Sequence, residues 1–110
     1  MSKKISIGET NKVEEEGIGK EKYIFQLFVT GILPNSARAI VNINEICEKY
    51  LKGRYELEII DIYQQPSKAL SENIIAVPVL IKKFPLPEAR LIGDLSDIKK
   101  VLELFLWTKI

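Results

Sequence analysis

Hydrophobic and polar positions alternate along the chain with two different periods. Residues 23–29 (YIFQLFV) are apolar on both alternating faces, and Gln26 is the one polar interruption. This pattern predicts a strand that is buried on both sides, as in a sheet covered by helices. A Thr-Gly break at 30–31 and a short loop follow the strand.

The segment after this break has the period of an amphipathic helix. Asn35 or Ser36 is expected to cap the helix, which runs to about Leu51, and Gly53 stands where a helix stop is needed. The residues expected to form its apolar stripe are Ala37, Ile40, Val41, Ile43, Ile46, Cys47, Tyr50 and Leu51. A strand, a tight loop and a helix start are typical of the first half of a βαβ unit.

Residues 55–62 (YELEIIDI) predict a second strand. Its first half alternates apolar and glutamate positions, which favours a place near the edge of the sheet. The helical connection makes this strand parallel to the first, with a right-handed crossover.

The middle of the chain reads as a short helix and two further strands. Ser67 is expected to cap a helix that runs to about Glu72. The apolar run 74–81 contains Pro78, which fits a strand only if Pro78 opens it, and a cis Val77–Pro78 bond is compatible with that position. Residues 82–84 are expected to continue outward, and 89–92 to pair back as a short strand that Gly93 ends.

The last helix is expected from Asp97 to about Trp107, with Asp94 or Ser96 as its cap. It carries more apolar residues than one packed face requires. Two interpretations stay open: a second contact, through self-association or a conformational alternative, or coverage of the end of the core by Trp107.

Residues 1–22 differ from the rest because lysine and glutamate alternate there with glycine and few large apolar residues. We therefore expect a flexible tail at 1–22, with a partner-binding arm as the alternative, and one domain at 23–110.

The composition limits the kinds of active site and metal site that the chain can form. The 110 residues carry a net charge of +1 and no histidine, which removes the commonest general base and the commonest metal ligand. Cys47 is the one cysteine and lies on the apolar stripe, so a buried inert thiol is favoured over a nucleophile. We expect no cofactor, metal, nucleic acid or membrane as partner, and a cytoplasmic location. Nucleic-acid binding could use Lys82, Lys83, Arg90, Lys99 and Lys100, but these residues are scattered, and a solvated surface is favoured.

The order of these elements resembles that of the thioredoxin-like fold. The loop Ile32-Leu33-Pro34-Asn35 occupies the position of the thioredoxin Cys-Gly-Pro-Cys, and Val77-Pro78 matches the cis-proline segment. Ile32 and Asn35 stand at the two cysteine positions, so the loop has no thiol. Disulfide exchange is therefore chemically excluded at this loop.

Four blocks make the chain similar to one redox-inactive branch, the KaiB family of circadian clock proteins. The blocks are LFVTGILPNSARAI (27–40), GRYELEIIDIYQQP (53–66), IIAVPVLIKKFPLPEARLIGDLSD (74–97) and KVL (100–102). The resemblance implies a non-enzymatic protein that binds the RecA-type ATPase KaiC, with KaiA as a further partner in cyanobacterial clocks.

The resemblance also implies two candidate folds after about Ile62. One is thioredoxin-like and monomeric, and the other is the KaiB ground-state arrangement, which belongs to a tetramer and turns part of 66–84 into helices. Such a switch needs two packings of similar free energy. Among the oligomeric states, a dimer or tetramer is expected. The alternatives are a sensor or interaction module for a histidine kinase, without a clock role, and a thioredoxin-like enzyme.

Three residues are expected to contact a partner. Arg38 keeps the family's Ser-x-Arg, and its planar fork suits a carboxylate, although a solvated helix face is an equal alternative. Glu58 and Asn73 stand where clock members typically carry lysines that meet the KaiC ring. Reversal of charge at Glu58 is expected to weaken complementarity with a standard KaiC. The matching residues expected to be structural are Pro34, Pro78, Gly93 and Asp94.

Overall fold

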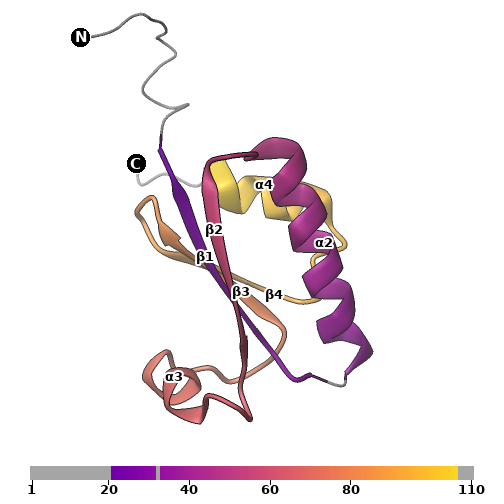
Figure 1. Cartoon of the computed structure of the whole chain (residues 1–110), viewed down its shortest axis with the longest axis vertical. Helices are drawn as coiled ribbons and strands as arrows, with labels where there is room; N and C mark the ends of the chain where they lie inside the picture. Colours follow the sequence, from indigo (N-terminus) through magenta and orange to yellow (C-terminus); the bar gives the residue numbers. More distant parts are fainter. Residues whose placement is uncertain (1–20, 32, 107–110) are drawn as a thin grey trace, which may run out of the picture.

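A computed structural model describes residues 21–31 and 33–106, and the structural statements below refer to these residues. Ile32, Trp107 and all but the last two positions of the predicted tail lie outside them. The elements in chain order are β1 (Tyr23–Val29), α2 (Pro34–Tyr50), β2 (Tyr55–Asp61), α3 (Pro66–Ser71), β3 (Val79–Phe84), β4 (Ala89–Ile92) and α4 (Ile98–Leu106) (Figure 1).

The four strands form one mixed sheet in the order β2-β1-β3-β4. β1 and β2 are parallel, and the pairs β1–β3 and β3–β4 are antiparallel. The predicted parallel crossover and the edge position of β2 are thus confirmed. Of the two arrangements expected after residue 62, this structure has the thioredoxin-like one.

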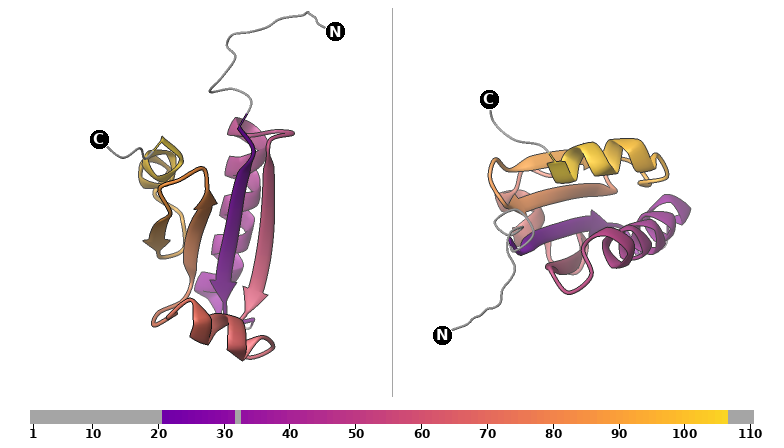
Figure 2. Two further views of the ribbon diagram at one scale, coloured as in Figure 1. Left: turned by 90° about the vertical axis from the view of Figure 1, so that its left-hand side faces the viewer. Right: turned by 90° about the horizontal axis from the view of Figure 1, so that it is seen from above.

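Helices α2 and α4 lie on the same face of the sheet and enclose the larger apolar core (Figures 1 and 2). The ring of Tyr23 contacts those of Phe25 and Phe105, with centroids 5.9 Å away in both cases. The hydroxyl of Tyr23 donates a hydrogen bond of 3.2 Å to the carbonyl oxygen of Phe105. The first strand and the last helix are therefore joined directly.

The opposite face of the sheet carries a smaller apolar cluster of Phe28, Ile60, Val79 and Ile81. Ile62, Ile74 and Val77, which flank α3 in the sequence, pack against it. Figure 1 shows α3 beside the end of the sheet, on the side away from α2.

The caps of the three helices differ from those expected. Leu33 is the N-cap of α2, because Pro34 occupies the first helical position, and Ser36 instead accepts a hydrogen bond of 3.1 Å from the N–H of Thr30. The start of α3 repeats this pattern, with Gln65 as N-cap and Pro66 following it, so Ser67 caps nothing. Before α4, Asp97 accepts a bond of 3.3 Å from the N–H of Lys100.

The apolar stripe of α2 also differs from the expected one. Its buried residues are Ser36, Ala39, Ile43, Ile46 and Cys47. Val41 is 55% exposed, and Ala37 and Tyr50 are exposed as well. At 100° per residue, Val41 lies about 200° from both Ala39 and Ile43 and therefore faces away from them. The core side includes a buried serine, which a hydrophobic pattern does not reveal.

The strand after Pro78 begins as expected and continues further. The Val77–Pro78 bond is cis, and β3 starts at Val79. Lys82, expected on a solvated surface, is instead fully buried in this strand between β1 and β4. Burial lowers its pKa, and the nearby Glu21 opposes this effect.

Candidate functional site

The loop between β1 and α2 is the corner at which a thioredoxin carries its dithiol. Asn35 is exposed in the first turn of α2, and its side-chain oxygen accepts a hydrogen bond from the guanidinium of Arg38. Cys47 lies further along the helix with no exposed surface, and burial, aided by Glu48, raises the pKa of its thiol to about 12. A thiol held in its protonated form is a poor nucleophile. The described residues of this corner therefore carry no reactive thiol and present only a surface for contacts with other molecules.

Arg38, a predicted partner contact, pairs with Asp94, which was expected to be structural. The Nε atom of Arg38 lies 3.2 Å from Oδ2 of Asp94, and Asn42 donates a bond of 2.9 Å to the Asp94 carbonyl oxygen. Hydrogen bonds from Ser96 and the charge of Arg38 lower the pKa of Asp94. These contacts tie the first half of α2 to the loop before α4.

Pro78 and Gly93, also expected to be structural, meet at the end of the β3–β4 pair. The N–H of Gly93 donates a bond of 3.0 Å to the carbonyl oxygen of Pro78. The φ of Gly93 is 126°, a conformation that side chains disfavour. Pro34 occupies the first helical position of α2.

Glu58 lies in the middle of β2, on the face opposite α2, and is bound by α3. The Nζ atom of Lys68 is 2.5 Å from its Oε2, and the amide of Gln26 is 3.3 Å from its Oε1. The hydrogen bond from Lys68 lowers the pKa of Glu58, and the bond from Gln26 acts in the same direction. The negative charge of Glu58 thus has a partner within the chain.

A second ionic cluster lies at the other end of α3, and sequence reasoning missed it. Glu72 contacts Lys83 of β3 at 2.8 Å and Arg90 of β4 at 3.0 Å. Glu88 contacts the same two basic residues at 3.2 Å and 3.7 Å. The hydrogen bond that Lys83 donates to Glu72 raises the pKa of Lys83. No periodic signal links these positions, because the fold alone brings them together.

Asn73 directly follows the C-terminal cap of α3 and has a φ of 56°. Its N–H donates a bond of 3.1 Å to the carbonyl oxygen of Leu70. Asparagine tolerates this left-handed conformation better than most residues. Asn73 therefore helps to end α3, besides its predicted role in partner contact.

Large apolar side chains are exposed around α3. Leu70 is 79% exposed, Ile75 is 97% exposed, and Tyr63 is 81% exposed. A cavity of about 430 Å³ opens here, lined by Ile62, Pro66, Ala69, Leu70, Asn73, Ile74 and Ile75. We call the side chains of Glu58, Lys68, Leu70, Asn73 and Ile75 the α3 surface. It contains two of the three predicted contact residues, whereas Arg38 lies on α2, across the sheet.

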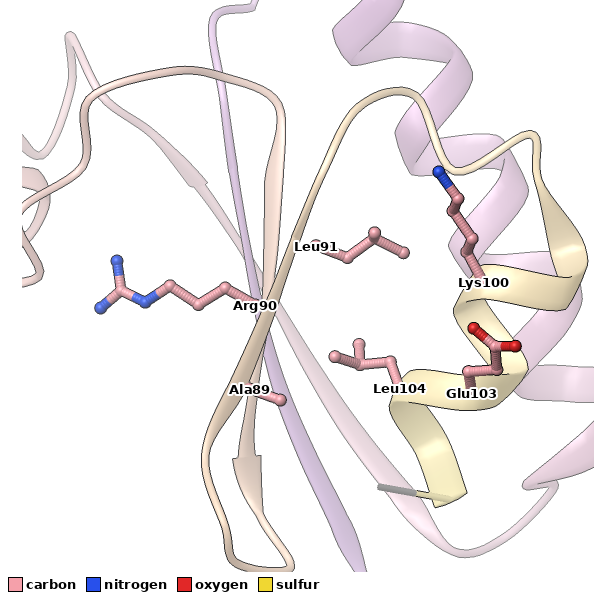
Figure 3. A pocket seen from close by; sticks show the side chains of 6 residues that line it. All are labelled: Ala89, Arg90, Leu91, Lys100, Glu103 and Leu104. Carbon is pink, nitrogen blue, oxygen red and sulfur yellow. The ribbon is translucent and has the colours of Figure 1, made fainter. Parts of the chain in front are cut away.

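A separate pocket of about 340 Å³ lies between β4 and α4 (Figure 3). Leu91 and Leu104 point into it, while Lys100 and Glu103 stand on the α4 side. Arg90 projects away from the pocket, toward the ionic cluster described above. The pocket is lined by three apolar residues, Ala89, Leu91 and Leu104, and by the charged residues Arg90, Lys100 and Glu103.

The described residues lack two kinds of feature. They contain no group of three or more Cys, Asp or Glu side chains placed to hold a metal ion. None of their helices combines the length and the apolar character needed to cross a membrane.

Two solved structures illustrate the likeness of the fold. The N-terminal domain of SasA from Synechococcus elongatus superposes with a TM-score of 0.65 at 20% identity, covering 94% of this chain and 98% of that domain. A thioredoxin from Fasciola hepatica also gives a TM-score of 0.65, at 14% identity, covering 83% and 86%. The architecture is therefore thioredoxin-like.

Sequence comparison is more specific. The KaiB domain family matches residues 26–107. The circadian clock oscillator protein KaiB of Prochlorococcus marinus subsp. pastoris is 46% identical over 85 residues, which are 77% of this chain and 79% of that protein. Its counterpart in Thermosynechococcus vestitus is 45% identical over 83 residues, 76% of this chain and 77% of that protein. By both measures, this chain belongs to the KaiB family.

Proposed function

We propose that this chain is a regulatory protein that acts by binding and not by catalysis, and that its partner is a KaiC-like RecA-type ATPase. The single observation that carries the proposal is the KaiB match across residues 26–107, which supports a circadian clock role. The chemistry agrees with it, because the sequence has no histidine and its one cysteine is buried with a raised pKa.

The α3 surface is the docking site in this proposal. Exposed apolar groups that gather in one place mark interaction sites more often than single ones do. Leu70 and Ile75 supply this apolar area, and Glu58 and Lys68 form an ion pair on the side of α3 that faces the sheet. Because Glu58 reverses a charge relative to typical clock members, the proposed partner carries a surface matched to an acidic β2.

The test is co-elution of the purified chain with a KaiC-like ATPase from the same genome, with its nucleotide fixed as ADP or as a non-hydrolysable ATP analogue. Leu70→Glu/Ile75→Glu is expected to weaken binding at least ~10-fold, because both side chains would lose apolar contact area. Val41→Glu, on the exposed side of α2, is the matched control and is expected to bind normally. Absence of binding in both nucleotide states would count against the proposal.

The proposal includes a second arrangement of the C-terminal half, as in the KaiB ground state, and assembly into a dimer or tetramer. Solution mass together with the NMR secondary structure of residues 66–84 tests both. A helical segment in a tetramer supports the second arrangement, and a proline-led strand in a monomer under all conditions excludes it.

If the chain instead acts as a module for a histidine kinase, the kinase will co-elute and the ring ATPase will not.

A further inference from the structure

Helix α3 contributes no buried residue to either apolar core, although the residues on both sides of it do pack there. It has six residues and none of them is buried. A helix of this length has no stability of its own in water. Ile62 before it and Ile74 and Val77 after it pack against the cluster under the sheet. Apolar packing therefore fixes the two ends of this segment, and something else must fix the helix between them.

Ionic contacts meet α3 at two points. Near its start, Lys68 reaches Glu58 of β2 at 2.5 Å. Just after its end, Glu72 reaches Lys83 at 2.8 Å and Arg90 at 3.0 Å. Lys68 and Glu72 are four residues apart and lie on the same side of the helix. The contacts span three strands, because Glu58 belongs to β2, Lys83 to β3 and Arg90 to β4.

The same geometry sets the direction of Leu70. It is two residues from both Lys68 and Glu72, which places it about 200° around the helix from each of them. When Lys68 and Glu72 face the sheet, Leu70 must therefore face solvent, and it is 79% exposed. The orientation of α3 that allows its ion pairs to form is therefore the same orientation that turns Leu70 toward solvent.

We propose that Glu58 and Glu72 are positioning residues: their ion pairs clamp α3 against the sheet and orient Leu70 for a partner. Weakening of the clamp releases α3 locally while the sheet stays folded, because the flanking apolar anchors remain. The clamp itself does not depend on the proposed function; only its consequence for binding rests on that proposal. Because the charges are partly exposed, salt screens them and loosens the helix.

Hydrogen exchange of the α3 backbone amides tests the clamp directly. The reporting hydrogen bonds are Ala69 N–H to Gln65 O at 3.3 Å, Glu72 N–H to Lys68 O at 3.1 Å and Ile74 N–H to Ala69 O at 2.9 Å. Glu58→Lys is expected to speed exchange of these amides roughly two- to ten-fold, since an exposed ion pair is replaced by a like-charge contact. Addition of 0.5 M NaCl to the unaltered protein is expected to act in the same direction.

The matched control is Glu56→Lys. Glu56 lies two residues earlier on the same face of β2, and its carboxylate contacts Lys22 at 2.7 Å and not α3. It makes the same change in net charge, so α3 exchange is expected to stay unchanged. The swap Glu58→Lys/Lys68→Glu is expected to restore most of the lost protection, although it places two carboxylates four residues apart, at positions 68 and 72.

The outcomes separate cleanly. Selective acceleration in α3 by Glu58→Lys, with recovery in the swap, supports the clamp. Equal effects of Glu58→Lys and Glu56→Lys, or faster exchange throughout β1 and β3, overturn it. Since exchange is measured without a partner, the clamp can stand even if no KaiC-like ATPase binds, and it can fail while binding persists.

Discussion

The side chain of Asp61 lies next to the position that a Cβ atom of residue 31 would occupy, and residue 31 is glycine. A Cβ built on Gly31 would be 2.7 Å from Oδ2 of Asp61, inside normal contact distance. The other carboxylate oxygen of Asp61 accepts a hydrogen bond of 2.8 Å from the N–H of Tyr63. The Asp61 carboxylate can thus lie this close to the chain after β1 because residue 31 has no side chain.

Gly31→Ala is expected to lower the free energy of unfolding by about 0.5–1.5 kcal/mol, because Asp61 must move and give up its bond to Tyr63. In an Asp61→Ala background the same change is expected to cost almost nothing, since the opposing carboxylate is gone. Urea unfolding of the four proteins gives the coupling. Strictly additive effects would show that the contact has no energetic role.

The thiol of Cys47 is expected to be inert in the folded protein. Its pKa of about 12 leaves almost no thiolate at pH 8, and its side chain is fully buried. Labelling with a thiol reagent should therefore be at least ~100-fold slower in native buffer than in 6 M guanidinium chloride. Rapid native labelling would mean that α2 opens readily at this position.

Tyr55 should make stability depend on pH in the alkaline range. Its hydroxyl donates a bond of 2.7 Å to Glu48, and this bond, with burial second, raises the pKa of Tyr55 to about 12. The protonated phenol is favoured by the fold, so its contribution is complete below pH 10 and is lost as pH rises from 10 toward 12.

Tyr55→Phe is accordingly expected to cost about 0.5–1 kcal/mol at pH 7, a value discounted for solvent screening of this half-buried group. The cost should shrink above pH 10. Both proteins should carry Cys47→Ala, because the buried thiol titrates in an overlapping range. Unfolding curves that differ by the same amount at pH 7 and pH 11.5 would contradict the prediction.

Asn73 offers a test of the left-handed end of α3. Asn73→Val is expected to destabilise by about 1–2 kcal/mol, because a β-branched residue at a φ of 56° is strained. Asn73→Gly should lie within about 0.5 kcal/mol of the unaltered protein. Since position 73 is exposed, packing losses do not complicate the comparison. Equal stability of the two variants would remove the conformational argument.

Sequence patterns predicted the order of the elements, because strand and helix periods are local properties, and they predicted the pairs β1–β2 and β3–β4 but not β1–β3. Tyr23–Val29 and Ala89–Ile92 were placed at their observed bounds, and the proline-led start of β3 followed from a missing N–H donor. The predicted cap of α2 was wrong because two helix-start signals, Pro34 and Asn35-Ser36, competed at neighbouring positions. Pro34 fixed the first turn, which left Ser36 inside the helix with a bond to Thr30.

The contacts of charged side chains could not be predicted, because they join residues that only the folded sheet brings together. Glu72 and Arg90 are eighteen positions apart and meet across two elements. Lys82 looks like a solvated lysine in the sequence, yet the fold buries it completely. The ion pairs around α3 therefore could not be predicted from the sequence, and the partner contacts expected at Glu58 and Asn73 stay a prediction.

The hydrogen bond from Tyr23 to Phe105 has a consequence for synthesis of the chain. It joins the first residue of β1 to the second-last residue of α4, and the aromatic cluster around it needs both. A nascent polypeptide still lacking α4 would leave Tyr23 and Phe25 open to water on that side. Completion of the larger core must therefore wait until translation has passed residue 105 and released it from the ribosomal tunnel.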